Sequence, residues 1–399
     1  MKILMLIPYL PYPPSEGGQV RSYNLIKLLS KKHKITLVCF TREHNTQEQV
    51  KHMEKFCNKV IVFKRGKTWT LKNILRTGLS LYPFLVSIYY SPNIKPTLKE
   101  ELENGNYDLI HAETFYAMPY LPEHNLPTVL VEQTVMSRIF GHYIKTEPKF
   151  WLRPFQLIDV IKIRFWERYF WKKADKVVAV SEEDANIMKA MVPGLKVDVV
   201  PNGVGEDFNN LPKNLHPNHT ILYMANYKWI QNWEAVDLLA RKVFPLIKSK
   251  VKDAKLAITG QFPTNDVKQL AGKDIKVHEL KDDDFGGVVS AYLKSGLFVA
   301  PMYAPGGTRL KILAAMAAMV PVVTTPIGAE GYGAVDGESI LIGETPADLA
   351  EKAVKVLENL NLYKKVAINA RNLVDTKFSW EPIAKKLESI YAEIINSKE

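Results

Sequence analysis

The sequence predicts an α/β protein of two doubly wound lobes, each built on a mainly parallel β-sheet that helices cover on both faces. Short apolar runs rich in β-branched residues alternate with stretches of helical periodicity, which is typical of repeated βαβ units. This alternation starts again after Pro201-Asn202-Gly203, which indicates a second lobe. The chain has 399 residues and is 47% hydrophobic, so it is large enough to bury two cores.

The first lobe is expected to contain six strands. Their sequences are nearly continuous in apolar residues, as expected of parallel strands buried on both faces. The first run is too short for the apolar core of a signal peptide, so we interpret it as a buried strand. The six runs are Lys2–Pro8, Ile35–Phe40, Val60–Phe63, Leu109–Ala112, Thr128–Glu132 and Lys176–Val180.

The second lobe is expected to begin after a hinge near residues 200–218, where proline, glycine and asparagine break regular structure. We expect domains at residues 1–203 and 204–379, with a C-terminal helix at 380–399 that packs back toward the first lobe. Ligands should lie in a cleft between the lobes, at the carboxyl ends of strands. The expected strands are Thr220–Met224, Lys255–Thr259, Leu297–Ala300 and Pro321–Thr325.

Composition limits the classes of partner and the compartment. The formal net charge of +11 favours polyanionic partners such as phosphates, anionic lipid surfaces or nucleic acid. The two cysteines, Cys39 and Cys57, are too few for a disulfide framework and lack metal-ligand spacing, which favours a reducing cytoplasm. No apolar run is long enough to span a membrane. We expect a cytoplasmic protein, with peripheral binding at the inner face of the cell membrane left open.

The most informative motif follows the strand that ends near Ala300. The pair Gly306-Gly307 allows backbone amides to approach a ligand, and a helix is expected to begin at about Thr308. Arg309 and Lys311 are basic residues at a helix start, where acidic residues are usually preferred. This combination predicts a diphosphate site. The alternative is a glycine turn followed by an amphipathic helix with solvated basic residues.

This stretch resembles the donor-binding signature of GT-B glycosyltransferases of family four, and within that family the bacterial sugar transferases with a Gly-Gly-Thr-Arg-Leu-Lys donor loop. The resemblance covers most of the chain, because further matching pieces occur in the expected order. The matching pieces are Gly17-Gly18, Ala179-Val180-Ser181, Pro201-Asn202-Gly203-Val204, Gly306-Gly307-Thr308-Arg309-Leu310-Lys311-Ile312-Leu313, Ala315-Met316-Ala317, Pro321-Val322-Val323 and Gly328-Ala329-Glu330-Gly331.

The resemblance implies two Rossmann-like lobes that face each other across a cleft, and a retaining, metal-independent transfer from a nucleotide sugar. It implies that the donor phosphates lie over the helix start at Gly306. Arg309 and Lys311 would then offset the charge that grows on the diphosphate as the glycosidic bond breaks. They are therefore candidate catalytic residues, and Gly306, Gly307 and Thr308 are candidate donor-binding residues.

The chain departs from this family at two positions. Ala314 stands where the family pattern has a glutamate that holds the nucleotide ribose, one helical turn after Lys311. An engineered knockout, a naturally weakened enzyme, or compensation by Glu330 would each explain Ala314. Met319 stands where the family usually has a glycine after the helix, which predicts strain in the turn before Pro321.

The first lobe supplies candidates of its own. By resemblance, Gly17, Gly18 and Arg21 meet the donor phosphates from the loop and helix after the first strand. His111 ends a strand, where ligands gather in such sheets, and the family has a histidine at this place. With the family resemblance, we expect His111 to position an acceptor hydroxyl or to steady charge near the anomeric carbon; without it, the residues favour a structural role.

Four further features have weaker signals. Glu132 and Gln133, at the end of the next strand, are acceptor-side candidates. Lys228 follows the first strand of the second lobe and could reach a phosphate or remain solvated, and Asn232 is expected to cap the following helix. The carboxylates of residues 282–284 are attributed to a helix N-terminus, and no metal site is expected. Aromatic and basic residues mix in Lys67–Tyr90 and Phe150–Lys173, which indicates an interfacial helix on anionic lipid or ordinary packing.

The sequence therefore predicts a glycosyltransferase that moves a hexose-type sugar from a UDP- or GDP-sugar to a glycan or a lipid-linked acceptor, without a cofactor. The alternative is a nucleotide-sugar-binding protein with weak or no turnover, because Ala314 replaces the expected glutamate. A nucleic-acid binder is a third class, but only the charge suggests it. No recognition motif for nucleic acid occurs, so we expect no nucleic-acid partner.

Overall fold

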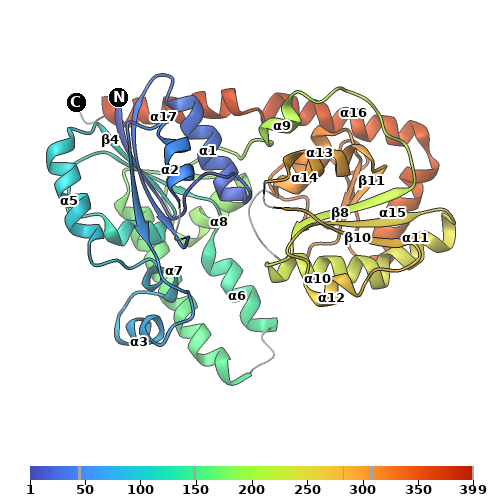
Figure 1. The fold of residues 1–399 in the computed structure, drawn as a ribbon, viewed down its shortest axis with the longest axis horizontal. Coiled ribbons are helices and arrows are strands. Elements are labelled where there is room, and N and C mark those ends of the chain that lie inside the picture. The colour runs from blue at the N-terminus through green and yellow to red at the C-terminus, as the bar shows by residue number, and fades with distance from the viewer. Residues whose placement is uncertain (44–45, 147–149, 282, 305–308, 398–399) are drawn as a thin grey trace. The chain divides into compact units, whose positions relative to one another are not determined.

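The computed structural model describes residues 1–43, 46–146, 150–281, 283–304 and 309–397. The chain divides into two compact units (Figure 1). Unit 1 comprises Met1–Pro201 together with Glu381–Glu399, and unit 2 comprises Asn202–Trp380. The chain therefore passes between the units twice, after Pro201 and after Trp380. In the described part of the chain, none of the helices is both long enough and apolar enough to cross a membrane.

Unit 1 contains a seven-stranded sheet in the order β3-β2-β1-β4-β5-β6-β7, and every neighbouring pair is parallel. Ile3 of β1 lies between Ile35 of β2 and Leu109 of β4, which sets the register at the centre of the sheet. The strands are β1 (Lys2–Ile7), β2 (Lys34–Thr41), β3 (Lys59–Lys64), β4 (Leu109–Glu113), β5 (Thr128–Glu132), β6 (Lys176–Ala179) and β7 (Val197–Val199).

The helices of unit 1 lie on both faces of this sheet (Figure 1). They are α1 (Gly17–Leu29), α2 (Gln47–Met53), α3 (Leu71–Leu79), α4 (Phe84–Ser87), α5 (Ile94–Gly105), α6 (Met136–Thr146), α7 (Arg153–Lys173), α8 (Glu182–Met191) and α17 (Trp380–Asn396), with the short helices η1 (Phe115–Tyr120) and η2 (Phe150–Leu152). The local sequence determines where several of these helices begin. At α8, for example, Ser181 accepts a hydrogen bond from the Asp184 backbone and acidic residues fill the first turn.

Unit 2 repeats the same plan with a six-stranded sheet in the order β10-β9-β8-β11-β12-β13, again with parallel neighbours. Its strands are β8 (Thr220–Asn226), β9 (Lys255–Gln261), β10 (Ile275–Glu279), β11 (Leu297–Ala300), β12 (Val322–Thr324) and β13 (Leu341–Ile342). Its helices are α9 (Glu206–Asn209), α10 (Ile230–Leu238), η3 (Leu239–Val243), α11 (Phe244–Lys250), α12 (Asn265–Lys268), α13 (Phe285–Leu293), α14 (Leu310–Ala317), α15 (Pro346–Glu358) and α16 (Leu360–Lys377).

The predicted α/β class with two doubly wound parallel sheets is confirmed, and each strand expected from the sequence is present. Sequence analysis missed β7, β10 and β13. All three lie at sheet edges. Edge strands bury less side-chain surface, so their sequences need no continuous apolar run: β7 contains a central Asp198, β10 alternates apolar and polar residues, and β13 has only two residues.

The C-terminal helix α17 completes unit 1. Its residues Leu387, Ile390 and Tyr391 are buried. On its outer side, Glu388 pairs with His33 at 2.9 Å, close to the start of β2. Residues from the two ends of the chain thus belong to one compact unit, whereas unit 2 is a single continuous segment.

The hairpin of α6 and α7 is anchored by buried carboxyl groups. Glu167 of α7 is fully buried and accepts a hydrogen bond of 3.1 Å from the backbone of Ser137, at the start of α6. Burial raises the pKa of Glu167 to about 7. Glu132, at the end of β5, accepts hydrogen bonds from the backbone of Phe115 at 3.0 Å and from the indole of Trp171 at 2.9 Å. Burial also raises the pKa of Glu132 well above its ordinary value.

We expect Glu167→Gln to remove one component of the pH dependence of stability. A carboxyl group whose pKa is raised on folding stabilises the fold fully below its unfolded pKa, and this contribution is lost as the pH rises to the folded pKa. The window therefore runs from pH 4.5 to about pH 7. Denaturant unfolding should show that the wild type loses up to about 3 kcal/mol across this window relative to Glu167→Gln. Glu182→Gln, an exposed substitution on α8, is the control; equal pH profiles for all three proteins would contradict the assignment.

Candidate functional site

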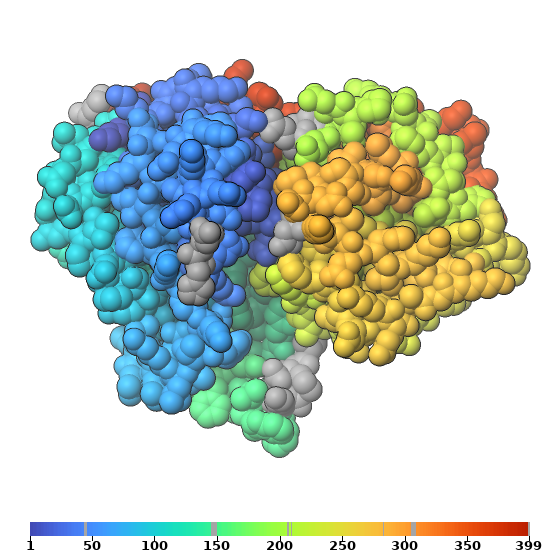
Figure 2. Space-filling view, viewed as in Figure 1, coloured from blue at the N-terminus to red at the C-terminus, as the bar shows by residue number. Residues whose placement is uncertain are grey.

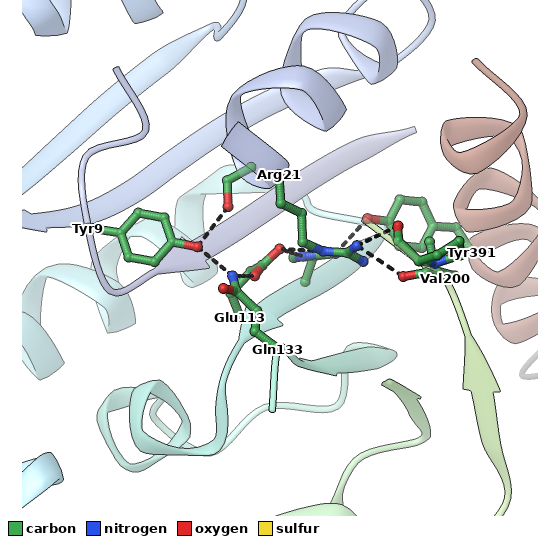
Figure 3. A network of polar contacts seen from close by, with 9 residues as sticks. Tyr9, Arg21, Glu113, Gln133, Val200 and Tyr391 are labelled. Carbon is green, nitrogen blue, oxygen red and sulfur yellow. Dashed lines mark hydrogen bonds and ion pairs between the residues drawn. The ribbon is translucent and has the colours of Figure 1, made fainter. Parts of the chain in front are cut away.

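Polar side chains gather in unit 1 where the strand order reverses. β1 and β4 are neighbours in the sheet, and the chain leaves β1 toward β2 on one side while β5 follows β4 on the other. In open parallel sheets this reversal leaves a crevice at the carboxyl ends of the strands, which is where ligands bind. The residues that gather here come from α1, from the ends of β4 and β5, and from α17 (Figure 3).

The sequence after the first strand predicts a helix that begins near Gln19, and α1 begins two residues earlier, at Gly17. A capping box explains the difference: the Glu16 side chain accepts from the backbone of Gln19, whose side chain accepts from the backbone of Glu16. Gly18 lies in the first turn, and a Cβ atom there would lie 2.5 Å from Tyr9 Oη and 2.7 Å from Gln133 Oε1. A larger residue at position 18 would collide with these two side chains where they now lie. Gly18 and Gln133, which the sequence identified separately, therefore lie side by side.

Arg21 of α1 is fully buried and holds two segments of unit 1 together. Its Nη1 donates hydrogen bonds of 2.9 Å to the backbone oxygens of Val200 and Pro201, and its Nε lies 3.7 Å from Glu113 Oε1. Burial lowers the pKa of Arg21, and the Glu113 carboxylate acts against that shift. These contacts give Arg21 a structural role in unit 1, and its contact with donor phosphates stays a prediction.

His111 is buried on β4 with a protein partner for each ring nitrogen. Its Nδ1 lies 2.6 Å from Tyr391 Oη of α17, and its Nε2 lies 3.4 Å from Glu113 Oε1. The predicted acceptor-side histidine is therefore part of the same network as Arg21. Its role toward an acceptor is not decided by these contacts and stays a prediction.

Glu113 is the centre of this network, and sequence analysis missed it. Burial alone would raise the pKa of Glu113, but the His111 hydrogen bond and the Arg21 charge hold it below its ordinary value. Gln133 Nε2 donates to both Glu113 and Tyr9 (Figure 3). A signal was present in the sequence, because residues two apart on a strand share one face and Glu113 is two residues after His111. Glu132, by contrast, points its carboxyl group at η1 and α7.

Unit 2 has its own strand-order reversal between β8 and β11, and α14 follows β11. Gly306, Gly307 and Thr308 lie outside the described residues. The described helix begins at Leu310 with Arg309 at the N-cap, rather than at about Thr308 with Arg309 in the first turn. The first turn of α14 contains no acidic residue, and Lys311 is the one charged residue in that turn. The basic helix start expected from the sequence is therefore present in the described part of α14.

The guanidinium of Arg309 binds backbone carbonyls on both sides of the helix start. Its Nη2 donates to the oxygen of Ala304 at 2.7 Å and its Nη1 to that of Ile327 at 2.8 Å. Tyr332 Oη accepts from the Arg309 backbone nitrogen and donates to the Arg309 backbone oxygen, at 2.8 Å each. Arg309 thus fixes the segments that flank α14. Loss of its side chain should therefore disturb the local fold as well as any contact with a donor.

Lys311 is half-buried beside Tyr223 of β8 and Asn232 of α10. Its Nζ donates to Asn232 Oδ1 at 2.6 Å and lies 3.5 Å from Tyr223 Oη. Burial lowers the pKa of Lys311 to about 7, and the nearby charge of Arg309 acts in the same direction. The expectation that Asn232 caps α10 is wrong: Trp229 is the N-cap, and Asn232 joins Lys311 Nζ to the backbone oxygen of Asn226.

The remaining candidates of unit 2 lie around α14. Ala314 is nearly buried, three residues after Lys311 and so on the same helix face. Met319, two residues after the end of α14, has φ +56°, the left-handed conformation that favours glycine, which agrees with the strained turn predicted from the sequence. Glu330 is half-buried after β12. Lys228 is exposed and its ammonium lies 3.2 Å from the ring centroid of Phe262, a cation–π contact; its contact with a phosphate stays a prediction.

The described residues include no group of three or more histidine, cysteine, aspartate or glutamate side chains placed to hold a metal ion. Within the acidic run at residues 282–284, Asp284 accepts a hydrogen bond of 2.8 Å from the Gly287 backbone and caps α13. This contact agrees with the helix-start role expected for that run.

Two family models match the chain in succession. Residues 15–208 match Glycosyltransferase Family 4, and residues 218–359 match Glycosyl transferases group 1. The chain belongs to the glycosyltransferases. The glycosyltransferase has the GT-B fold, in which two Rossmann-like sheets follow each other along the chain, and the family resemblance is confirmed.

Relatives and solved structures match the glycosyltransferase along most of its length. An uncharacterized 44.6 kDa protein in the cps region of Klebsiella pneumoniae is 22% identical, over 98% of this chain and 99% of its own. Phosphatidyl-myo-inositol mannosyltransferase of Mycobacterium leprae is 22% identical over 78% of this chain and 80% of its own. The crystal structure of Anabaena HepE in complex with UDP and glucose has a TM-score of 0.62 and 15% identity, over 98% of this chain and 100% of that one.

We expect Arg21 and Glu113 to be strongly coupled in stability. Removal of one member of a buried ion pair leaves a buried charge without its partner and costs roughly 3 to 5 kcal/mol. Arg21→Met and Glu113→Gln should each lower the free energy of unfolding, and the double variant should be clearly more stable than the sum of the single effects. The exposed pair Lys99 and Glu103 is the control, with coupling of about 0.3 to 0.5 kcal/mol. Additive effects of Arg21 and Glu113 in denaturant unfolding would contradict the coupling.

Proposed function

We propose that this glycosyltransferase binds a nucleotide-diphosphate sugar in unit 2 and transfers its hexose to a glycan or lipid-linked acceptor held by unit 1. The transfer retains the anomeric configuration and needs no metal ion. The observation that carries the proposal is Lys311, a half-buried lysine in the first turn of α14, beside the strand-order reversal of unit 2.

The start of α14 suits a diphosphate on several physical grounds. A helix N-terminus attracts anions through its free amides and dipole, and the first turn has no acidic side chain to oppose this. Lys311 lies among neutral oxygen atoms at a lowered pKa, so an incoming anion would restore its full charge. As the glycosidic bond breaks, negative charge grows on the leaving diphosphate. A fixed cation at this position stabilises that charge more than it stabilises the bound donor.

The donor nucleotide and the loop that cradles it are the next part of the proposal. We assign the phosphates to Gly306, Gly307 and Thr308, the residues that precede Arg309 in the sequence. UDP is the first nucleotide to test, since the HepE structure contains it. Lys228 and Glu330 are proposed to complete the donor site, and Glu330 would replace the ribose contact that Ala314 cannot make.

The acceptor is proposed to bind at the network of unit 1. We propose that His111 and Gln133 face the acceptor and that Gly17 and Gly18 face the donor phosphates. Glu113 is added because it binds both His111 and Gln133. A buried carboxylate that holds a histidine in one orientation is suited to fixing a sugar hydroxyl. The Mycobacterium leprae relative, named for a phosphatidylinositol acceptor, supports testing lipid-linked acceptors beside free glycans.

Ala314 supports a second candidate, a nucleotide-sugar-binding protein with little turnover. A methyl group at this position cannot accept hydrogen bonds from a ribose. The two candidates differ in one measurement: both bind the donor, but only the enzyme releases nucleotide faster in the presence of acceptor.

We expect thermal-shift experiments with UDP, GDP, ADP and their sugars to select one nucleotide. A ligand at about one hundred times its Kd stabilises a protein by about 2.7 kcal/mol, enough for a clear rise in Tm. The rise should be larger in Ala314→Glu, because the added carboxylate can hold the ribose. Ala271→Glu, at an exposed site of unit 2, is the control and should behave as the wild type. No rise in Tm for either the wild type or Ala314→Glu would reject the donor site.

Lys311 should make donor binding pH-dependent. Its pKa is about 7, and binding of the diphosphate favours the ammonium form. Calorimetry with the preferred nucleotide sugar should show affinity falling as the pH rises above 7, approaching about tenfold per unit. A nucleotide sugar suits this test because its diphosphate is esterified at both ends and does not itself titrate near neutral pH.

Lys311→Met should abolish this pH dependence and lower kcat/KM by roughly 100- to 1000-fold. Lys355→Met, an exposed substitution on α15, serves as the control and should leave both unchanged. A pH-independent affinity in the wild type, or unchanged turnover in Lys311→Met, would remove Lys311 from the site.

A further inference from the structure

One surface of unit 1 exposes large apolar side chains that the core does not use. It is formed by α3 and the loops around it, by η2, and by the outer face of α7, and is called the apolar shelf below. Leu79 is 88% exposed, Leu81 80%, Trp69 78% and Phe155 72%. Scattered exposed apolar residues are ordinary, but a contiguous set of this kind marks an interaction surface.

Helix α7 has two apolar faces, and only one of them packs on unit 1. Ile163, Phe170 and Trp171 are buried and point into the core. The opposite face carries exposed apolar residues three or four positions apart, the spacing of one helix stripe. This exposed stripe consists of Phe155, Ile158, Ile161, Phe165 and Tyr169. Because one apolar stripe of α7 packs on the core and the other is exposed, the exposed stripe is open to contact with a partner.

The shelf is a built surface, because side chains of α7 fasten the segment that contains α3. Lys162 Nζ donates hydrogen bonds of 2.7 Å to the backbone oxygens of Thr77 and Ser80, at the end of α3. Trp166 Nε1 donates to the backbone oxygen of Leu81 at 3.0 Å. The two segments accordingly lie side by side in unit 1 (Figure 2). Their exposed apolar residues therefore form one surface.

The charges around the shelf have one sign. The exposed charged residues of α7 are all basic, since Asp159 is half-buried against the Phe84 backbone and Glu167 is buried. Arg168 and Lys172 flank the exposed stripe on one side and Lys173 on the other. The segment from Lys55 to Lys99, which includes α3, contains no aspartate or glutamate. The shelf is thus an apolar face bordered by cations.

We propose that the apolar shelf docks unit 1 on an anionic lipid bilayer. The apolar side chains enter the boundary of the acyl chains, with Trp69 and Trp151 at headgroup level, and the basic residues contact the lipid phosphates. The inner face of α7 stays packed on the core, so the helix lies along the bilayer. A second copy of the chain fits less well, because symmetric pairing would bring the same cations together. This function goes beyond the proposed transfer and needs no donor nucleotide.

Vesicle co-sedimentation tests the docking directly with the full chain. The probes are phosphatidylcholine vesicles with and without phosphatidylglycerol. The wild type should bind the anionic vesicles, and Leu79→Glu/Phe165→Glu should lose that binding. Leu246→Glu/Leu360→Glu, which places the same change at exposed apolar sites of unit 2, should bind as the wild type does. All of these residues are exposed, so circular dichroism and Tm should stay unchanged.

A charge variant tests the basic border independently. Each cation near an anionic surface contributes about a fivefold gain in affinity, so Arg168→Gln/Lys172→Gln should bind anionic vesicles about 25-fold more weakly. Its residual binding should also depend less on salt. Lys250→Gln/Lys252→Gln in unit 2 is the matched control.

Two results would overturn the proposal. One is that the substitutions make no difference: wild type, shelf variants and control variants all bind anionic vesicles equally, or none of them binds. The other is a dimer in sedimentation velocity that Phe165→Glu converts to a monomer, since the shelf would then be covered by a second copy. Neither result affects donor binding, which the nucleotide panel measures separately.

Discussion

A parallel sheet brings the carboxyl ends of all its strands to one edge, and this constraint determines where chemistry can occur in both units. Where the strand order reverses, neighbouring loops leave in opposite directions and the edge stays uncovered. In unit 1 this place lies between β1 and β4, and in unit 2 between β8 and β11. The networks around Glu113 and Lys311 occupy these two places. Each network joins residues from segments that are far apart in the sequence, and the order of the strands brings these segments together.

The two networks treat buried charge in opposite ways. In unit 1 the Glu113 carboxylate faces the Arg21 guanidinium, so a cation and an anion offset each other inside the fold. In unit 2 the partners of Lys311 Nζ are neutral oxygens, and the charge that acts on it is another cation, Arg309. A partly desolvated cation without an anionic partner is costly for stability, and this cost is acceptable where a ligand supplies the anion. The charges of Glu113 and Arg21 therefore balance without a ligand, whereas the charge of Lys311 is balanced when an anionic substrate binds.

Sequence patterns were sufficient for the central strands and for the edge strand β3, but not for the edge strands β7, β10 and β13 or for the networks. Central strands such as β1 and β5 are buried on both faces, so their apolar runs are visible along the chain. β10 alternates apolar and polar residues because one side of it has no neighbour. Gly18 and Gln133 were each identified locally, but their mutual contact depends on the packing of α1 against β5 and leaves no local signal. The interpretation of Asn232 failed for a related reason, since its hydrogen bond to Lys311 joins helices far apart in sequence.

The discontinuity of unit 1 affects how the protein is made. Domains usually fold as they leave the ribosome, N-terminal part first. Here Tyr391, the partner of His111, emerges only after the whole of unit 2 has been synthesised. Unit 2 can therefore finish folding while the earlier-made segment Met1–Pro201 still lacks α17, the helix whose Leu387 and Ile390 are buried in unit 1. If translation stops before α17, the apolar surface of Met1–Pro201 on which α17 packs stays exposed. Chaperones and proteases recognise such a state.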